Sequence, residues 1–220
     1  SYRCYMVNNF LNASIIIKKI SKIIIGTHNR GKFKEISDLL PSNLIKISPW
    51  ELKLPSPEEV GMTFKENSEI KAKFFSKNSD LLCISDDSGL EIKLLNGDPG
   101  IYSARWAEPG NNFNNAIIKV FKELEKKDPN WKINKKIEAN FICCLSICLP
   151  NGKIISREGK INGSISNSKR GINGFGYDPI FIPDGYSQTF GEMEQKLKYK
   201  IDHRSKAYEN IKKFLFNLLI

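Results

Sequence analysis

The sequence lacks the features that mark secreted, zinc-binding and membrane-spanning proteins. Its five cysteines are an odd number and none forms a CxxC pair, which argues against a disulfide framework and a structural zinc site. This cysteine usage favours a reducing, cytoplasmic location. The longest apolar runs, such as residues 15–17 and 23–25, are much shorter than the roughly 20 residues of a transmembrane helix. The 220 residues, 40% of them hydrophobic, nevertheless suffice for one sizeable core.

Acidic residues are missing from the first 34 positions, and this absence accounts for most of the net charge. The chain has 34 Lys+Arg and 24 Asp+Glu, a formal charge of +10. Seven basic residues precede the first acid, Glu35, which leaves 27 basic against 24 acidic residues in the remainder. The excess indicates an anionic partner, such as nucleic acid, acidic lipid or a phosphorylated small molecule. Because most of this excess positive charge lies at the N-terminal end, the argument for a nucleic-acid partner is weaker.

The domain organisation follows from where ordered patterning begins. We expect residues 1–21 to be a poorly ordered N-terminal extension and residues 22–220 to form a single domain. The alternative for residues 1–21 is a targeting segment. However, they contain one Arg and three Ser, and the apolar stretch 13–17 is shorter than a secretory signal requires.

Strand and helix patterns alternate from residue 22 onward. Asn151-Gly152 lies between two long apolar runs, which predicts a β-hairpin. The strands expected are 23–25, 44–47, 81–85, 137–149 and 153–165. The helices expected are 30–40, one beginning at Thr63 with a capping box to Glu66, one capped by Asn114 or Asn115, and 204–218. Residues 86–112 and 169–183 are expected to be loops, the first with short strands. The fold class predicted is α/β with a mixed sheet.

A turn between the first strand and helix is the first candidate site. Residues 26–32 read GTHNRGK, and a strand-to-helix turn with small residues offers backbone N–H groups and a positive helix end to a phosphate. Lys32 adds a point charge. The turn is not a P-loop, because Phe33 stands where Ser or Thr is required. An ordinary capped βα loop is the alternative.

Clustered acids form a second candidate site. Asp86 and Asp87 follow a predicted buried strand, and adjacent carboxylates at a strand end suit a hard cation such as Mg²⁺. A solvated Asp turn is the alternative. Glu58 and Glu59 lie in a loop before the Thr63 helix, where one of them can supply a second ligand or simply be exposed.

Two further segments carry residues suited to a nucleobase. Phe175 and Tyr177 stand among three glycines, an arrangement that can stack a base and donate backbone hydrogen bonds; a turn with two core aromatics is the alternative. Lys198 and the pair His203-Arg204 precede or begin the last helix, which favours contact with an anion or a base.

In this order, the motifs resemble the inosine triphosphate pyrophosphatase family. The resemblance covers residues 22 to about 218, and each piece alone is much less specific than the set. The matching pieces are TxNxGK at 27–32, GMTFxEN at 61–67, KA at 71–72, SDDSGL at 85–90, PGIYSAR at 99–105, GFGYDPIF at 174–181 and HR at 203–204.

The resemblance implies an elongated mixed sheet flanked by helices, with two lobes and a substrate cleft between them. It implies Mg²⁺-dependent hydrolysis of non-standard purine nucleoside triphosphates (ITP, dITP, XTP) to the monophosphate and pyrophosphate, usually by a homodimer. Neither stable nucleic-acid binding nor membrane attachment is expected. The roles implied are phosphate contacts for Thr27, His28, Asn29, Arg30, Gly31 and Lys32; Mg²⁺ binding for Glu59 and Asp87, with Asp87 as proton acceptor; substrate contact for Ser88; and base recognition for Phe175, Gly176, Tyr177, Asp178, Lys198, His203 and Arg204.

Two other functions stay open. A nucleic-acid-binding module would use the basic surface with Phe175 and Tyr177, and would not need Asp86 or Asp87. An inactive relative would keep the fold only. Asp202 departs from the family pattern and places a negative charge beside the proposed base reader, where it can orient Arg204 or weaken its contact.

Overall fold

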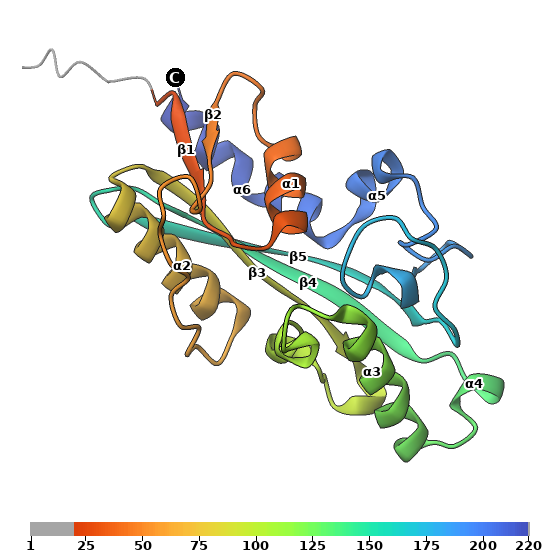
Figure 1. Cartoon of the computed structure of the whole chain (residues 1–220). Coiled ribbons are helices and arrows are strands. Elements are labelled where there is room, and N and C mark those ends of the chain that lie inside the picture. The colour runs from red at the N-terminus through yellow and green to blue at the C-terminus, as the bar shows by residue number, and fades with distance from the viewer. Residues whose placement is uncertain (1–19, 220) are drawn as a thin grey trace, which may run out of the picture.

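The computed structural model describes residues 20–219, and six strands within them form one mixed sheet (Figure 1). The strands are β1 (Lys22–Ile25), β2 (Ile45–Ile47), β3 (Leu82–Ile92), β4 (Glu138–Cys148), β5 (Ile154–Ile165) and β6 (Phe181–Pro183). Their order is β2-β1-β3-β4-β5-β6. Strand β1 pairs in parallel with β2 and β3, and the other pairs are antiparallel. The mixed sheet and the hairpin joining β4 to β5 are confirmed. The expected extension, residues 1–21, lies outside the described residues except for its last two.

Helices flank the sheet and begin at side-chain caps. They are α1 (Arg30–Leu39), α2 (Phe64–Ser79), α3 (Phe113–Lys127), α4 (Trp131–Asn134), α5 (Gln195–Ile201) and α6 (His203–Leu219). Thr63 caps α2 by accepting the Glu66 amide, as the capping box predicts. The cap of α3 is Asn112, so the expected cap at Asn114 or Asn115 is wrong by two or three residues. Helix α5 was not expected.

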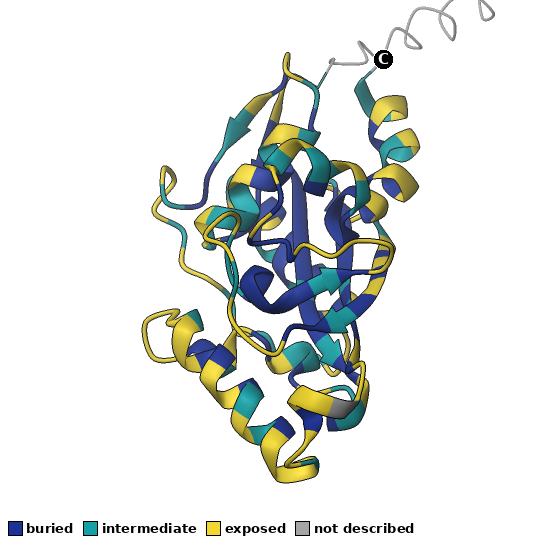
Figure 2. Ribbon diagram, turned by 90° about the vertical axis from the view of Figure 1, so that its right-hand side faces the viewer, coloured by how far each residue is buried: buried dark blue, intermediate teal, exposed yellow. Residues whose placement is uncertain are grey.

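Helices α2 and α6 cover opposite faces of β3. Cys83 shares a buried cluster with Ala72 and Phe75 of α2, whereas the next residue, Ile84, shares one with Ala207 of α6. Successive side chains of a strand point to opposite faces, so the two helices must lie on different sides. Figure 2 shows the result, with dark-blue strands between helices whose outer surfaces are exposed.

Strand β3 extends through the acidic motif, which corrects the expected loop at 86–112. The strand runs to Ile92 and pairs with β4 along its length, for example Asp87 with Cys144. Three short 3-10 turns follow, η1 (Lys93–Leu95), η2 (Gly100–Tyr102) and η3 (Arg105–Ala107). Gly89 is required within the strand because a Cβ there would lie 2.3 Å from the Gly100 carbonyl oxygen. The glycine therefore permits a close approach and does not end the strand.

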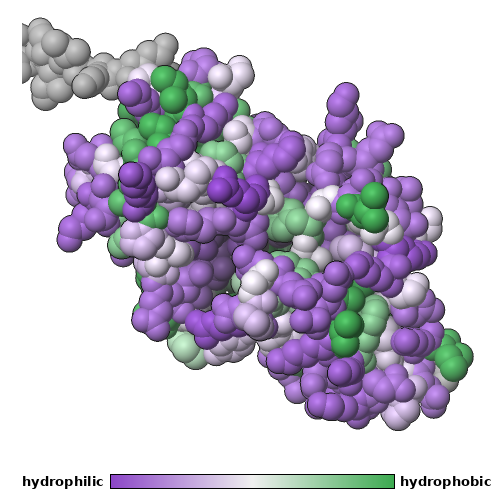
Figure 3. All heavy atoms as spheres, in the orientation of Figure 1, coloured by the Kyte–Doolittle hydropathy of each residue, from purple (hydrophilic) through white to green (hydrophobic). Residues whose placement is uncertain are grey.

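The hydrophobic core is divided along the long strands. Ile84, near the start of β3, belongs to a cluster with α1 and α6, and Leu90, near its end, belongs to a cluster with α3. The acidic motif lies between these two clusters. The surface in the view of Figure 3 is mostly hydrophilic and is hollowed between its upper-left and lower-right parts. Among the helices of residues 20–219, none has the length and apolar character needed to cross a membrane.

Gly159 lets the start of α6 lie directly on β5. A Cβ at this position would stand 2.2 Å from the Ala207 amide nitrogen and 2.3 Å from the His203 carbonyl oxygen. We expect Gly159→Ala to lower the free energy of unfolding by about 1–3 kcal/mol, because backbone atoms cannot move aside as a flexible side chain can. Denaturant unfolding measures the loss, with Lys160→Ala as an exposed neighbouring control. A Gly159→Ala variant as stable as the control would contradict the close packing.

Candidate active site

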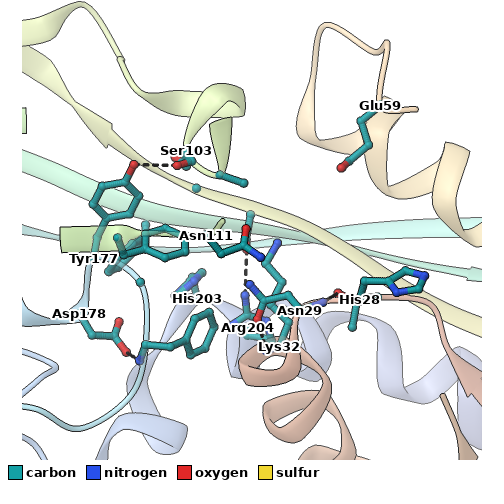
Figure 4. A pocket seen from close by; sticks show the side chains of 18 of the residues that line it. His28, Asn29, Lys32, Glu59, Ser103, Asn111, Tyr177, Asp178, His203 and Arg204 are labelled. Atoms are coloured by element: carbon teal, nitrogen blue, oxygen red, sulfur yellow. Dashed lines mark hydrogen bonds between the residues drawn. The ribbon is translucent and has the colours of Figure 1, made fainter. Parts of the chain in front are cut away.

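A cavity between the two core clusters collects most of the residues singled out in the sequence (Figure 4). The expected site residues that line it are Thr27, His28, Asn29, Lys32, Glu59, Ser88, Phe175, Gly176, Tyr177, Asp178, Lys198, His203 and Arg204. Arg30, Gly31 and Asp87 do not line it. The guanidinium of Arg30 instead lies 3.5 Å over the Trp50 ring. The cavity therefore unites segments that are far apart in the chain.

Hydrogen bonds between its own side chains and its backbone fix the conformation of the turn between β1 and α1. The Thr27 hydroxyl accepts a hydrogen bond from the Asn29 amide (3.1 Å), and the Asn29 side chain accepts one from the Lys32 amide (3.0 Å). Asn29 thereby caps α1 and leaves amides of the first turn at the positive end of the helix. Gly31 lies against the Phe175 ring, which an added Cβ would approach to 2.6 Å. The turn and the aromatic loop are thus neighbours.

The two adjacent aspartates do not act as a pair, because they point to opposite faces of β3. Asp86 and Ser88 both accept hydrogen bonds from Arg204 of α6. Asp87 faces the other side, where Lys71 of α2 is the cation with the largest effect on its pKa. The expectation of two carboxylates together at a strand end is therefore wrong, since successive side chains of a continuous strand alternate.

Asp86 is a fully buried carboxylate neutralised by two cations. The Arg204 Nη2 atom lies 3.1 Å from Asp86 Oδ2, and the Lys32 Nζ atom lies 3.5 Å from the same oxygen. Burial alone raises the pKa of Asp86, but the charges of Lys32, Arg204 and Lys71 outweigh burial and hold the pKa well below its usual value. Asp86 therefore stays ionised and orients these cations.

Asp87 is buried differently and is less well satisfied. Its Oδ2 atom has no hydrogen-bond partner within residues 20–219, and 7% of the residue remains exposed. Burial raises the pKa of Asp87, and the charges of Lys71 and Lys32 offset only part of this effect. Nearby, Lys71 Nζ forms an ion pair of 3.0 Å with Glu59 Oε1. The charge of Lys71 therefore acts on two carboxylates, on Glu59 through an ion pair and on Asp87 through its pKa.

A second buried network centres on Glu35 of α1. Lys198 and Arg204 each donate a hydrogen bond to its carboxylate, and Lys198 also donates one to Asp178 (2.8 Å). Burial opposes ionisation of Glu35, but Arg204 and Lys198 outweigh it and lower the pKa of this carboxyl. The two cations expected to contact a base are therefore held rigidly by protein carboxylates.

The glycine-rich loop places Phe175 in the cavity and Tyr177 in the core. Asp178 accepts a hydrogen bond from the Phe175 amide (3.0 Å), and the Phe175 ring centroid lies 5.1 Å from Lys198 Nζ. Tyr177 is 3% exposed, and its hydroxyl donates to the Ser103 carbonyl oxygen (2.7 Å). Phe175 can accordingly stack on a planar ligand, whereas Tyr177 supports the loop from behind.

The residues that begin α6 are fixed by packing and capping. The His203 ring stacks on Phe141 with a centroid distance of 4.7 Å, and its Nδ1 atom has no partner within the described chain. Burial, followed by the charges of Arg204 and Lys198, holds the pKa of His203 well below its usual value, so the ring is neutral. The Asp202 side chain accepts a hydrogen bond from the Ser205 amide (2.7 Å), so Asp202 caps α6.

The sequence reasoning gave no role to several residues in and around this site, among them Glu35, Lys71 and Asn111. Glu35 and Lys71 were given no role, although each is buried and pairs with expected site residues. The signal for Glu35 was its position three residues after Lys32, which places both on one face of the first helix. Asn111 also lines the cavity, and nothing in its local sequence indicated that.

Comparisons with known proteins agree on one family. A family model described as the Ham1 family matches residues 23–214. A dITP/XTP pyrophosphatase of Zymomonas mobilis is 41% identical over 191 residues, which span 86% of this chain and 90% of the relative. One of Caulobacter vibrioides is 40% identical over 90% of this chain and 99% of the relative. The solved HAM1 protein of Coxiella burnetii superposes with a TM-score of 0.79, at 33% identity, over 90% of this chain and all of that one.

Proposed function

This chain belongs to the Ham1 family, and from that premise we propose that it hydrolyses non-standard purine nucleoside triphosphates (dITP, ITP and XTP) to the monophosphate and pyrophosphate. The relatives named dITP/XTP pyrophosphatase support this activity. The observation that carries the proposal is the cavity. It joins a capped helix start with Lys32, the Glu59 carboxylate and the Phe175 ring, and Asp87 directly precedes the lining residue Ser88.

The two carboxylates fit a Mg²⁺ ion shared with the substrate. Asp87 Oδ2 is buried without a partner in the described chain, and Glu59, which lines the cavity, pairs with Lys71, whose charge also acts on Asp87. Residues 20–219 contain no group of three His, Cys, Asp or Glu able to hold a metal alone. Mg²⁺ is commonly bound by one or two carboxylates together with substrate phosphates, so two protein ligands suffice. Bound there, Mg²⁺ would neutralise charge that develops on the phosphoryl oxygens.

The chain's own residues supply the remaining steps. We assign the Thr27–Lys32 turn to the triphosphate, whose charge the α1 amides and Lys32 offset. Asp87 accepts the proton of the water that attacks the α-phosphorus, and pyrophosphate leaves. Lys71 holds the Glu59 carboxylate by an ion pair, and its positive charge opposes the effect of burial on the pKa of Asp87. The Ser88 hydroxyl, which accepts a hydrogen bond from Arg204 (2.8 Å) on the face of β3 opposite Asp87, contacts the substrate.

Base recognition follows from counting donors. An ammonium has three N–H donors, and Lys198 uses two of them on Glu35 and Asp178. A guanidinium has five, and Arg204 uses four on Glu35, Asp86 and Ser88. Among residues 20–219, one donor of each cation is left without an acceptor, and we assign it to the 6-oxo group of a base stacked on Phe175. Adenine carries an amino donor at that position and would leave these groups unpaired.

The products of the reaction test this assignment. We expect purified protein to release pyrophosphate and dIMP from dITP when Mg²⁺ is present, and neither product after chelation of the metal. Separate quantification of pyrophosphate and orthophosphate distinguishes cleavage at the α-phosphorus from stepwise removal of phosphate. Release of orthophosphate as the primary product would contradict the proposed reaction.

Glu59 and Glu58 form a matched pair of variants, since either was open as the metal ligand. Glu59 lines the cavity and pairs with Lys71, whereas Glu58 is exposed and lies outside the lining. We expect Glu59→Gln to raise the Mg²⁺ concentration for half-maximal activity by about 10- to 100-fold. Mutation of a residue that only supports a metal ligand typically weakens metal binding by this factor, and loss of a ligand should cost at least as much. In Mg²⁺ titrations, Glu58→Gln should need the same Mg²⁺ concentration as the wild type. The reverse outcome would show that Glu58, and not Glu59, is the metal ligand.

Three remaining expectations form part of the proposal. Four thiols, Cys83, Cys143, Cys144 and Cys148, are buried and unpaired, which supports a reducing, cytoplasmic compartment. The family resemblance supports a single domain in each chain and a homodimer of two chains. Sedimentation of the purified protein would test the dimer. Tyr177 is buried and donates to Ser103, so it is not exposed beside Phe175, which disfavours a nucleic-acid stacking platform built from these two rings.

A further inference from the structure

The loop that carries Glu59 is anchored at both ends but weakly held in the middle. We call residues 55–62, between Leu54 and Thr63, the Glu59 loop. At one end the Leu54 amide bonds to the Pro49 carbonyl (2.9 Å). At the other, the Gly61 and Met62 amides bond to side chains of α2. The loop has neither helix nor strand.

Arg105 holds the middle of this loop from across the cavity. Its Nη2 atom donates a 2.9 Å hydrogen bond to the Glu59 carbonyl oxygen. Within residues 20–219 this is the one hydrogen bond to the backbone of residues 55–60. Arg105 begins η3, whose Ala107 belongs to the core cluster of α3, whereas Lys71, which holds the Glu59 carboxylate, lies on α2. Figure 4 shows the Glu59 loop facing the turn that bears Ser103.

Glu59 is therefore fixed at two points by cations from opposite sides. Lys71 sets the direction of its carboxylate, and Arg105 sets the position of its backbone. The Arg105 guanidinium also lies 5.1 Å over the Tyr102 ring, which limits its own movement. Without Arg105, the one tie left on Glu59 within residues 20–219 is its side-chain ion pair with Lys71, and the backbone of residues 55–60 is free to rearrange.

We propose that Arg105 is a positioning residue that fixes the Glu59 loop across the cavity and so sets the affinity of the metal site. This inference rests on the proposed function, in which Glu59 is a metal ligand. Arg105 acts through the Glu59 backbone and does not line the cavity itself. Its loss should weaken metal binding more than it changes turnover at saturating metal or the preference among bases.

Two variants and a control test Arg105. Arg105→Met keeps the length of the side chain and removes its donors, and Arg105→Lys keeps one charge that can reach a carbonyl. Lys119→Met removes another cation of the same lobe, 4.4 Å over the Trp106 ring, without touching the loop. Because Arg105 is exposed, each variant should fold. The readouts are Mn²⁺ binding by electron paramagnetic resonance, amide exchange of residues 56–62, and the Mg²⁺ dependence of pyrophosphate release from dITP.

We expect Arg105→Met to weaken Mn²⁺ binding about fivefold, the effect of one exposed hydrogen bond from a charged donor. Amide exchange of the Glu59 loop should accelerate, Arg105→Lys should recover part of both losses, and Lys119→Met should match the wild type. Unchanged Mn²⁺ affinity in Arg105→Met overturns the proposal, whether or not exchange accelerates. If the wild type releases no pyrophosphate, the proposed function fails, while Mn²⁺ binding and exchange still decide the role of Arg105.

Discussion

Asp87→Asn should lower kcat for dITP by about 10²- to 10⁴-fold, the range typical for loss of a general base. The asparagine amide matches the shape of the carboxylate but accepts no proton from water and binds a hard cation poorly. Asp86 and Asp87 each have one buried oxygen without a partner in the described chain, but the other oxygen of Asp86 is held by Lys32 and Arg204, so Asp86 is not free to replace Asp87. Steady-state kinetics with saturating Mg²⁺ measure the loss.

The control for Asp87→Asn separates catalysis from folding. Asp184→Asn removes an exposed carboxylate that pairs with Lys136 far from the cavity, and should leave kcat unchanged. Thermal unfolding should show that Asp87→Asn is folded, because the substituted group makes no ion pair within 4 Å in the described chain. An Asp87→Asn variant with wild-type turnover would remove Asp87 from the mechanism.

Glu35→Gln should destabilise the fold by about 3–5 kcal/mol, the usual cost of removing one member of a buried charge network. Glu35 is 3% exposed and accepts hydrogen bonds from both Lys198 and Arg204. A glutamine keeps the size of the side chain but leaves the two cations without their shared counter-charge. Denaturant unfolding at pH 7 measures the loss. Asp38→Asn, on the exposed side of the same helix, is the matched control and should change little.

The pH dependence of the Glu35→Gln loss has a defined sign. In the folded protein the pKa of Glu35 lies below the ordinary value of 4.5, because Arg204 and Lys198 outweigh its burial. Its ionisation therefore stabilises the fold fully above about pH 4.5, and this contribution is lost as the pH falls through the lowered folded-state pKa. The difference in stability between wild type and Glu35→Gln should shrink on acidification. A difference independent of pH would show that Glu35 acts through packing alone.

Much of the fold could be read from local patterns. The hairpin between β4 and β5 followed from Asn151-Gly152, and the start of α2 followed from Thr63 and Glu66, because turn and capping chemistry depend on neighbouring residues. The continuation of β3 could not be read in this way. Gly89 is typical of a turn, and only the distant Gly100 carbonyl explains why a strand needs a glycine there.

The site shows the same division between local and long-range information. Short motifs indicated the phosphate turn, the acids and the aromatic loop, because each has its chemistry within a few residues. Ion pairs between distant residues could not be predicted from local sequence. Glu35 pairs with Lys198, more than 160 positions away, and Lys71 pairs with Glu59 only because the chain bends before α2. The opposite orientations of Asp86 and Asp87 also depended on the strand continuing through them.

Selectivity for the base tests the central claim most directly. Pyrophosphate release should be measured side by side for XTP, dITP, ITP and ATP at one Mg²⁺ concentration, with kcat/KM for each. Because Lys198 and Arg204 retain donors beside Phe175, we expect the three 6-oxo purine substrates to be hydrolysed at least about 10²-fold more efficiently than ATP, within the range that unpaired polar groups impose. Equal kcat/KM values for dITP and ATP would contradict the proposed recognition of non-standard purines.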